Sequence, residues 1–177
     1  NEDSYYVDEE MAIYAVADGV GGGRAGDVAS RVFCDVVREH RESFRTVLSQ
    51  PLQSTENRNH AMVVMSKLFN VASERIFRLS EGDAKYRGMS TTGLVMAMGG
   101  GGAMLGHVGD SRAYLIEKDE ARRLTVDHTL AQELIQQGLL AEDEYETFQY
   151  RNVLARAIGQ FPSVRVDTLW LDLSFGD

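Results

Sequence analysis

The stretch MAIYAVADGVGGGRAG, residues 11–26, passes abruptly from apolar residues to glycines. Residues 11–17 are apolar on both sides of an extended chain and too few for a typical helix, so they predict a buried strand. Asp18 and Gly19 end this strand, and three consecutive glycines follow shortly after it. An apolar pattern at helical spacing then runs over residues 26–48, which predicts a helix. The stretch therefore predicts a buried strand that ends in a carboxylate beside a glycine-rich loop.

The elements expected after this stretch are one more long helix, a run of strands and a mixed C-terminal region. In chain order they are a helix at 60–79, strands at 91–98, 103–108 and 112–116, a short helix at 129–137, a partly helical segment at 141–157 and a strand at 164–173. Short turns at 99–102 and 109–111 join the three consecutive strands, so we expect an antiparallel meander. Consecutive helices followed by a run of strands favour an α+β fold with antiparallel sheets over a parallel βαβ sheet.

Composition and charge argue against several classes of protein. The 177 residues fit one domain, and no apolar run is long enough to span a membrane. The formal net charge of −9 argues against nucleic-acid binding, which depends on Lys and Arg neutralising phosphates. The single cysteine, Cys34, allows no intrachain disulfide and suits a reducing compartment. We therefore expect a cytoplasmic protein with no nucleic-acid partner and no membrane segment.

Asp18 and Gly19 have two interpretations. An acid at the end of a buried strand exposes its carboxylate at the sheet edge, and the following glycine lets its own carbonyl approach the same ion. Mg²⁺ and Mn²⁺ prefer such oxygen ligands. The simpler interpretation is an ordinary turn that begins with Asp and continues with flexible glycines. This motif alone does not decide between a metal site and a turn.

Gly21, Gly23 and Gly26 also match the glycine spacing of a dinucleotide-binding loop. That loop belongs to a unit with a second strand roughly 30 residues on, whereas a second helix is expected here. Asp18 would also place an unscreened negative charge close to a pyrophosphate. The Lys-Ser or Lys-Thr pair of a phosphate-binding loop does not follow the glycines. A nucleotide-dependent oxidoreductase is therefore a weaker alternative that rests on glycine spacing alone.

Further candidate site residues lie at the start of the chain and in a later turn. Glu2 and Asp3 are adjacent carboxylates that, taken alone, are typical of a solvated terminus. Asp110 is a common type of turn residue, but it could also face Asp18 across a sandwich of two sheets. The hydroxyls of residues 90–92 are expected to bond to backbone groups, and we assign them no catalytic role.

Taken in order, the motifs of this chain resemble those of one family. They are Asn1-Glu2-Asp3, Ala17-Asp18-Gly19-Val20-Gly21-Gly22, Ser90-Thr91-Thr92, Gly109-Asp110-Ser111-Arg112-Ala113, Asp127-His128-Thr129 and Leu154-Ala155-Arg156-Ala157-Ile158-Gly159. Each motif is weak alone, but their order and spacing along the chain are specific. The chain resembles the type 2C (PPM) family of metal-dependent protein serine/threonine phosphatases, and Val20 resembles its bacterial branch.

The resemblance implies two antiparallel β-sheets packed as a sandwich and flanked by pairs of antiparallel helices, a four-layer αββα arrangement. It implies a single domain over residues 1–177, truncated at both ends, with a variable flap at about 138–153 beside the cleft. The family's phosphate-binding Arg would precede residue 1, and two further metal aspartates would follow residue 177. The fold is therefore expected to be incomplete, and the 177-residue piece inactive or nearly so on its own.

The resemblance also implies a centre that holds two Mn²⁺ or Mg²⁺ ions, with room for a third. Asp18 would bridge the two ions, and the carbonyl of Gly19 would bind one of them. Glu2 and Asp3 would lie near the first ion, and Asp110 would help to hold the third. Asp18 and Asp3 are the catalytic candidates in this picture. The implied reaction is hydrolysis of phosphoserine and phosphothreonine in phosphoproteins by a metal-activated bridging water.

The implied partners are phosphoprotein substrates of a serine/threonine kinase, on which the protein acts as a monomer. The alternative function is a phosphatase-like binding or sensor module without turnover. The presence of Glu2, Asp3, Asp18 and Asp110 counts against that alternative, because a site without catalysis is free to lose its acids.

Overall fold

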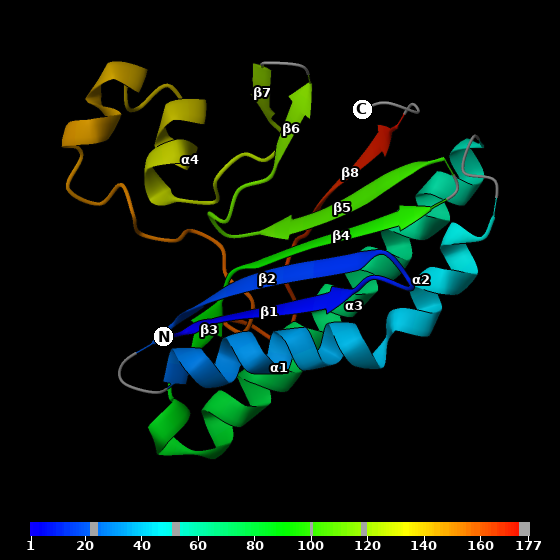
Figure 1. Ribbon diagram of the computed structural model, residues 1–177. Coiled ribbons are helices and arrows are strands. Elements are labelled where there is room, and N and C mark those ends of the chain that lie inside the picture. Colours follow the sequence, from blue (N-terminus) through cyan, green and yellow to red (C-terminus); the bar gives the residue numbers. More distant parts are fainter. Residues whose placement is uncertain (22–24, 51–53, 100, 118–119, 174–177) are drawn as a thin grey trace.

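A six-stranded antiparallel sheet forms the centre of the molecule (Figure 1). The computed structural model describes residues 1–21, 25–50, 54–99, 101–117 and 120–173. The strands of this sheet are β1 (Asp3–Asp8), β2 (Ile13–Val20), β3 (Ser90–Thr91), β4 (Gly93–Gly99), β5 (Gly102–Val108) and β8 (Asp167–Asp172). Their order is β1-β2-β4-β5-β8, and the short β3 pairs with the end of β2.

The helices α1 (Ala25–Glu39), α2 (Arg41–Leu48) and α3 (Thr55–Gly82) cover one face of this sheet (Figure 1). The other helices are α4 (Leu130–Gln136) and the short 3₁₀ helices η1 (Ala84–Tyr86) and η2 (Glu142–Thr147). α1 and α3 pack on the sheet because each has an apolar stripe at helical spacing. In α1 the fully buried residues include Ala29, Phe33 and Val36. Phe33 meets Phe69 of α3 edge to face, with ring centroids 5.1 Å apart.

The register of the sheet decides which side chains share a face. Side chains alternate along each strand, so residues that are paired across strands point to the same side. Ile13, Ala15 and Ala17 of β2 are buried beneath the helices. Val16 alternates with them and is exposed, so it lies on the opposite face. Asp18, two residues further on, shares that opposite face.

The smaller second sheet consists of β6 (Tyr114–Glu117) and β7 (Glu120–Arg123). It lies with α4 on the side of the large sheet that faces away from α1 and α3 (Figure 1). The predicted strand at 112–116 is therefore present, but its predicted pairing with the preceding strand is wrong. β6 pairs with β7, and β8 pairs with β5 instead. The chain leaves the large sheet at Gly109, which has a φ of +106° that favours glycine.

Other elements differ from the predictions at their ends or in number. The helix predicted over 26–48 is divided at His40 into α1 and α2, although its apolar pattern continues across the break. The helix predicted at 60–79 is longer because Ser54 caps it at its start, where its side chain accepts a hydrogen bond from Asn57 N–H. The segment at 141–157 is helical in part, as predicted, and its helical part is the 3₁₀ helix η2.

The predicted α+β class with antiparallel sheets is confirmed. The single domain over 1–177 and the flap at 138–153 remain predictions. Gly22 and Gly23 of the glycine loop, and Gly100 of the predicted turn at 99–102, lie outside the described residues. Among the helices of the described part of the chain, none has the length and apolar character needed to cross a membrane.

Candidate metal centre

Asp3 and Asp18 come from neighbouring strands and lie opposite each other. β1 and β2 pair antiparallel, with Asp3 in register with Asp18. Both carboxylates therefore leave the sheet on the side away from α1 and α3. Glu2 extends this pairing, because its carbonyl accepts a hydrogen bond from the N–H of Gly19 at 3.1 Å. The first residues of the chain are thus held against the end of β2, although their strand was not predicted.

Gly19 allows the start of α1 to approach the end of β2. A Cβ on Gly19 would lie 2.0 Å from the carbonyl oxygen of Gly26 and 2.7 Å from that of Glu2. Any side chain at this position would push α1 and the first residues of the chain apart. Because glycine has no side chain, α1 and the first residues of the chain can both pack against the backbone of residue 19, whose carbonyl is the expected metal ligand.

The backbone of Asp18 is fixed by residues that follow α3. The hydroxyl of Thr91 donates to the carbonyl of Asp18 at 3.0 Å, and the N–H of Thr92 donates to the same carbonyl at 2.9 Å. Both threonines are buried. The position from which the Asp18 carboxylate projects is therefore set by two strands at once, β1 on one side and the β3–β4 segment on the other.

Four carboxylates gather around the end of β2. Asp18 is exposed as a whole residue, but partial burial of its carboxyl group raises its pKa, Asp3 raises it further by its charge and by hydrogen bonding, and the charges of Asp110 and Glu2 add to the increase. Burial also raises the pKa of Asp110, although its own backbone N–H lowers it, and the charge of Asp127 adds a further increase. The structure thus brings Glu2, Asp3 and Asp110 close enough to Asp18 for their ionised forms to repel it.

The chemistry of this group of acids suits a divalent cation. Hard cations bind carboxylate and carbonyl oxygens, and their charge would relieve the repulsion at Asp18. Within the described ranges, however, no three His, Cys, Asp or Glu side chains converge closely enough to hold a metal ion. An ion that bound here would have to draw the carboxylates together. In charge and in ligand type, these four carboxylates suit Mn²⁺ or Mg²⁺.

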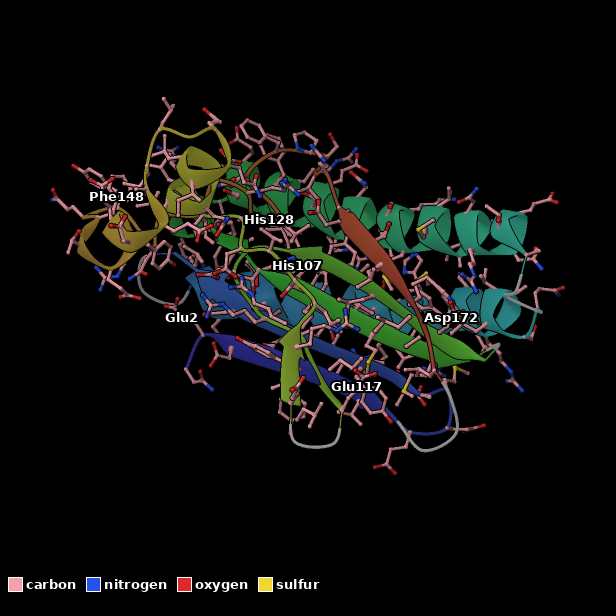
Figure 2. All side chains as sticks on the ribbon, turned by 90° about the horizontal axis from the view of Figure 1, so that it is seen from above. Glu2, His107, Glu117, His128, Phe148 and Asp172 are labelled. Carbon is pink, nitrogen blue, oxygen red and sulfur yellow. The ribbon has the colours of Figure 1, made fainter. Side chains whose placement is uncertain are left out.

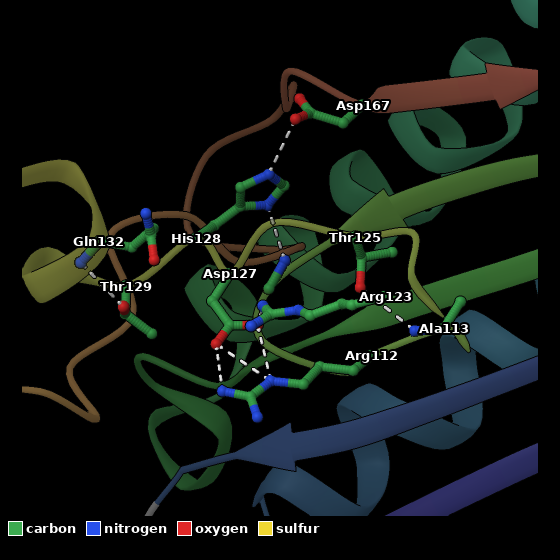
Figure 3. A network of polar contacts seen from close by, with 10 residues as sticks. Arg112, Ala113, Arg123, Thr125, Asp127, His128, Thr129, Gln132 and Asp167 are labelled. Atoms are coloured by element: carbon green, nitrogen blue, oxygen red, sulfur yellow. Dashed lines mark hydrogen bonds and ion pairs between the residues drawn. The ribbon is translucent and has the colours of Figure 1, made fainter. Parts of the chain in front are cut away.

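The turn that carries Asp110 is held by His128, nineteen residues later. The N–H of His128 donates to the carbonyl of Gly109 at 2.8 Å, and the N–H of Gly109 donates to Nδ1 of His128 at 3.0 Å. An amide N–H can only donate, so Nδ1 carries no proton and Nε2 carries it. Nε2 then donates to Asp167 at 3.2 Å (Figure 3). Arg156 donates to the other oxygen of Asp167 at 2.7 Å.

Comparison with known proteins identifies the family. A family model for protein phosphatase 2C matches residues 1–161 of this chain. The chain belongs to the protein phosphatase 2C family. The serine/threonine phosphatase stp of Listeria innocua is 30% identical over 181 residues, which cover 100% of this chain and 68% of that protein. The crystal structure of Stp1 from Staphylococcus aureus matches with a TM-score of 0.81 at 25% identity, over 99% of this chain and 66% of that one.

A third comparison concerns metal content. The catalytic domain of the phosphatase PstP, crystallised with 2 manganese ions, has a TM-score of 0.72 at 24% identity and covers 97% of this chain and 66% of that one. At that identity the likeness shows a shared fold. The chain spans about two thirds of the length of these relatives. The resemblance to bacterial type 2C phosphatases that the motifs indicated is confirmed.

A polar network that was not predicted lies beside Asp110. Asp127 is buried, with 4% of its side chain exposed, and it accepts hydrogen bonds from Arg112 at 2.6 and 3.2 Å and from Arg123 (Figure 3). Hydrogen bonding to Asp127 raises the pKa of Arg112. The network joins both ends of the β6–β7 hairpin to the segment before α4. The only signal in the sequence was the family motif Asp127-His128-Thr129.

His107 is the second feature that the motifs did not predict. Its ring lies 4.7 Å from the ring of His128, and both side chains are buried (Figure 2). Burial lowers the pKa of His107 to about 4, and the neighbouring His128 contributes to the decrease. Its Nε2 has no hydrogen-bond partner among the described residues. His107 is therefore a neutral ring inside the fold at neutral pH.

Proposed function

We propose that this protein hydrolyses phosphoserine and phosphothreonine in phosphoproteins with the help of Mn²⁺ or Mg²⁺ ions. The observation that carries the proposal is the group of acids around Asp18, at the end of a buried strand, in a chain of the protein phosphatase 2C family. The proposed ligands are the side chains of Glu2, Asp3, Asp18 and Asp110 and the carbonyl of Gly19.

The positions of these residues support separate roles. Asp3 faces Asp18 across the strand pair, and the charge of Asp110, which lies in the turn after β5, raises the pKa of Asp18. Asp18 is therefore suited to contact two ions, whereas Asp110 is suited to a further one. Asp18 and Asp3 would also accept hydrogen bonds from the attacking water and orient it toward phosphorus. The bound ions would supply Lewis-acid activation of that water and neutralise charge on the phosphoryl oxygens.

Manganese is the ion to test first. The fold of this chain is shared with the PstP catalytic domain, which was crystallised with 2 manganese ions. Mg²⁺ has the same preference for oxygen ligands and is the alternative. A third ion would depend on Asp110.

The flap predicted at residues 138–153 is proposed to contact the substrate. A cavity of about 260 Å³ is lined by residues of η2, α4 and the β6–β7 hairpin region. One of its lining residues, Arg112, follows Asp110 by two residues in the chain. Glu142 and Glu146 line it from the flap side, and Arg112 lines it from the side of the hairpin. The carboxylates would favour substrates with basic residues beside the phosphorylated one. We further propose that the protein acts as a monomer in the cytoplasm on substrates of a serine/threonine kinase.

The experiment that tests the proposal is Asp18→Asn in the intact protein, which removes the charge and keeps the shape. We expect weaker Mn²⁺ binding and almost no turnover of a phosphothreonine peptide. The matched control is Asp35→Asn on the outer side of α1, where the carboxylate forms an exposed ion pair with Arg38. A rate for Asp18→Asn close to that of the control would refute the role of Asp18. An intact protein that binds the phosphopeptide tightly but never hydrolyses it would favour the binding module.

A further inference from the structure

The hydroxyl of Thr92 connects the two segments that carry Asp18 and Asp110. Oγ1 of Thr92 accepts a hydrogen bond from the N–H of Asp18 at 2.9 Å. The same atom lies 2.8 Å from Oγ of Ser111, the residue that follows Asp110. The side chain of Thr92 is buried, with the residue 1% exposed. One atom thus touches the main chain of β2 and the turn after β5.

The direction of these hydrogen bonds follows from the chemistry of the groups. The N–H of Asp18 can only donate, so Oγ1 of Thr92 is its acceptor. The proton of Thr92 then remains available for Oγ of Ser111. A hydroxyl is therefore needed at residue 92, because an alkyl group of the same size would leave the Asp18 N–H without this partner.

The methyl group of Thr92 supports the other side of the same turn. A Cβ on Gly109 would lie 2.6 Å from Cγ2 of Thr92, so the turn rests directly on this methyl group. Thr92 therefore contacts both neighbours of Asp110, Gly109 through its methyl group and Ser111 through its hydroxyl. From the other side, His128 bonds to both backbone groups of Gly109.

We infer that Thr92 is a positioning residue that fixes the distance between the carboxylates of Asp18 and Asp110 and so prepares both for metal binding. The inference rests on the proposed function. Its physical basis is that one buried side chain contacts the backbone of Asp18 and both neighbours of Asp110. Groups that orient metal ligands typically change metal affinity by about 10- to 100-fold when they are removed.

The simplest competing explanation is that Thr92 only stabilises the sheet. Thr91 provides a matched control, because it is also a buried threonine whose hydroxyl bonds to the backbone of Asp18. Its hydroxyl donates to the carbonyls of Asp18 and Thr92 and, among the described residues, makes no hydrogen bond to the Asp110 turn. Thr91→Val and Thr92→Val should therefore cost similar stability. They should differ in metal affinity, since only Thr92 joins the two carboxylate-bearing segments.

The experiment measures Mn²⁺ affinity of the intact protein by calorimetry, together with urea unfolding of the metal-free protein and kcat and KM for a phosphopeptide. We expect Thr92→Val to weaken Mn²⁺ binding by about tenfold or more and to lower kcat with little change in KM. Thr92→Ser should restore most of the affinity, because it keeps the hydroxyl. Ser111→Ala breaks the same link from a partly exposed position, and combining it with Thr92→Val should add little further loss.

Two outcomes would overturn the inference. Native Mn²⁺ affinity in Ser111→Ala and in folded Thr92→Val would overturn it, and so would an equal loss of affinity in Thr91→Val. If Thr92→Val does not fold, Ser111→Ala and Thr92→Ser decide alone. Failure of the proposed function is distinguishable, because it would appear as undiminished Mn²⁺ binding in Asp18→Asn. Loss of binding in Asp18→Asn with native binding in the other variants would remove only the role of Thr92.

Discussion

The carboxylate of Glu2 occupies the space that a side chain on Gly26 would need. A Cβ on Gly26 would lie 2.3 Å from a carboxylate oxygen of Glu2 and 2.8 Å from the carbonyl carbon of Gly19. Gly26 lies in the first turn of α1, where the partial positive charge of the helix favours a carboxylate. The absence of one side chain thus lets α1 begin directly against two of the proposed ligands.

Gly26→Ala should therefore disturb the metal centre. We expect Mn²⁺ binding weaker by on the order of tenfold and a stability loss of about 1–3 kcal/mol from overpacking. The matched control is Gly82→Ala at the end of α3, where a Cβ would meet nothing within 4 Å. Calorimetric titration with Mn²⁺ and urea unfolding measure both effects. Unchanged Mn²⁺ affinity in Gly26→Ala would argue that neither Glu2 nor Gly19 is a ligand.

Asp3→Asn should have opposite effects with and without metal. It removes a like charge directly opposite Asp18, and such pairs cost a few tenths to about 1 kcal/mol. The variant should therefore resist urea better than the original protein when EDTA is present. In Mn²⁺ the order should reverse, because the original protein gains more from binding. A variant that is less stable in both solutions would show that Asp3 supports β1 rather than an ion.

The sequence predicts this centre only in part, for reasons that particular residues make clear. The strand before Asp18 was predictable because its apolar run is continuous, whereas β1 alternates exposed and half-buried residues and gives a weak signal. Asp3 lies opposite Asp18 because of the register between β1 and β2. That register is set by the turn between the two strands, where Ala12 has a φ of +49°. The support of the Asp110 turn by His128 depends on contacts between distant segments, which local patterns do not specify.

His107 should make the fold sensitive to acid. Its pKa is lowered to about 4 by burial and then by His128, with Asp167 and Asp127 opposing the shift, whereas an unfolded His titrates near about 6.5. The unfolded state gains the proton first as the pH falls. Stability is therefore full above about pH 6.5 and is lost progressively toward about pH 4. Urea unfolding across this range should show a smaller decrease in His107→Phe, and an equal decrease would exclude His107 as the cause.

Cys34 should be unreactive in the folded protein. Burial raises the pKa of its thiol to about 12, and the charge of Asp35 adds to the increase. The thiolate is the reactive form, and its fraction near neutral pH is then on the order of 10⁻⁵. We expect a disulfide reagent to label native protein only as fast as it unfolds, and to label it rapidly in urea. Fast labelling under native conditions would show that α1 opens without unfolding of the whole chain.

Asp127→Asn should destabilise the protein strongly, because it removes the buried carboxylate at the centre of a network of ion pairs. The carboxylate is 4% exposed and neutralises Arg112 and Arg123 together. An amide there would leave two partly exposed guanidinium groups facing a neutral partner, at a cost on the order of 2 kcal/mol, because solvent still reaches both of them. The matched change is Asp172→Asn, whose ion pair with Arg58 is 71% exposed on the acid side and should contribute less than about 1 kcal/mol.

The two aspartate variants compare a buried carboxylate that binds two arginines with an exposed carboxylate that binds one. A difference in their urea midpoints therefore reports burial and the number of arginine partners together. Asp127→Asn should also lower the rate of phosphopeptide hydrolysis, because Arg112 follows Asp110 by two residues and its anchor fixes the same turn. Asp172 lies at the end of β8, away from that turn, so its variant should keep the original rate. Equal unfolding midpoints and equal rates would show that the buried network neither stabilises the hairpin nor positions Asp110.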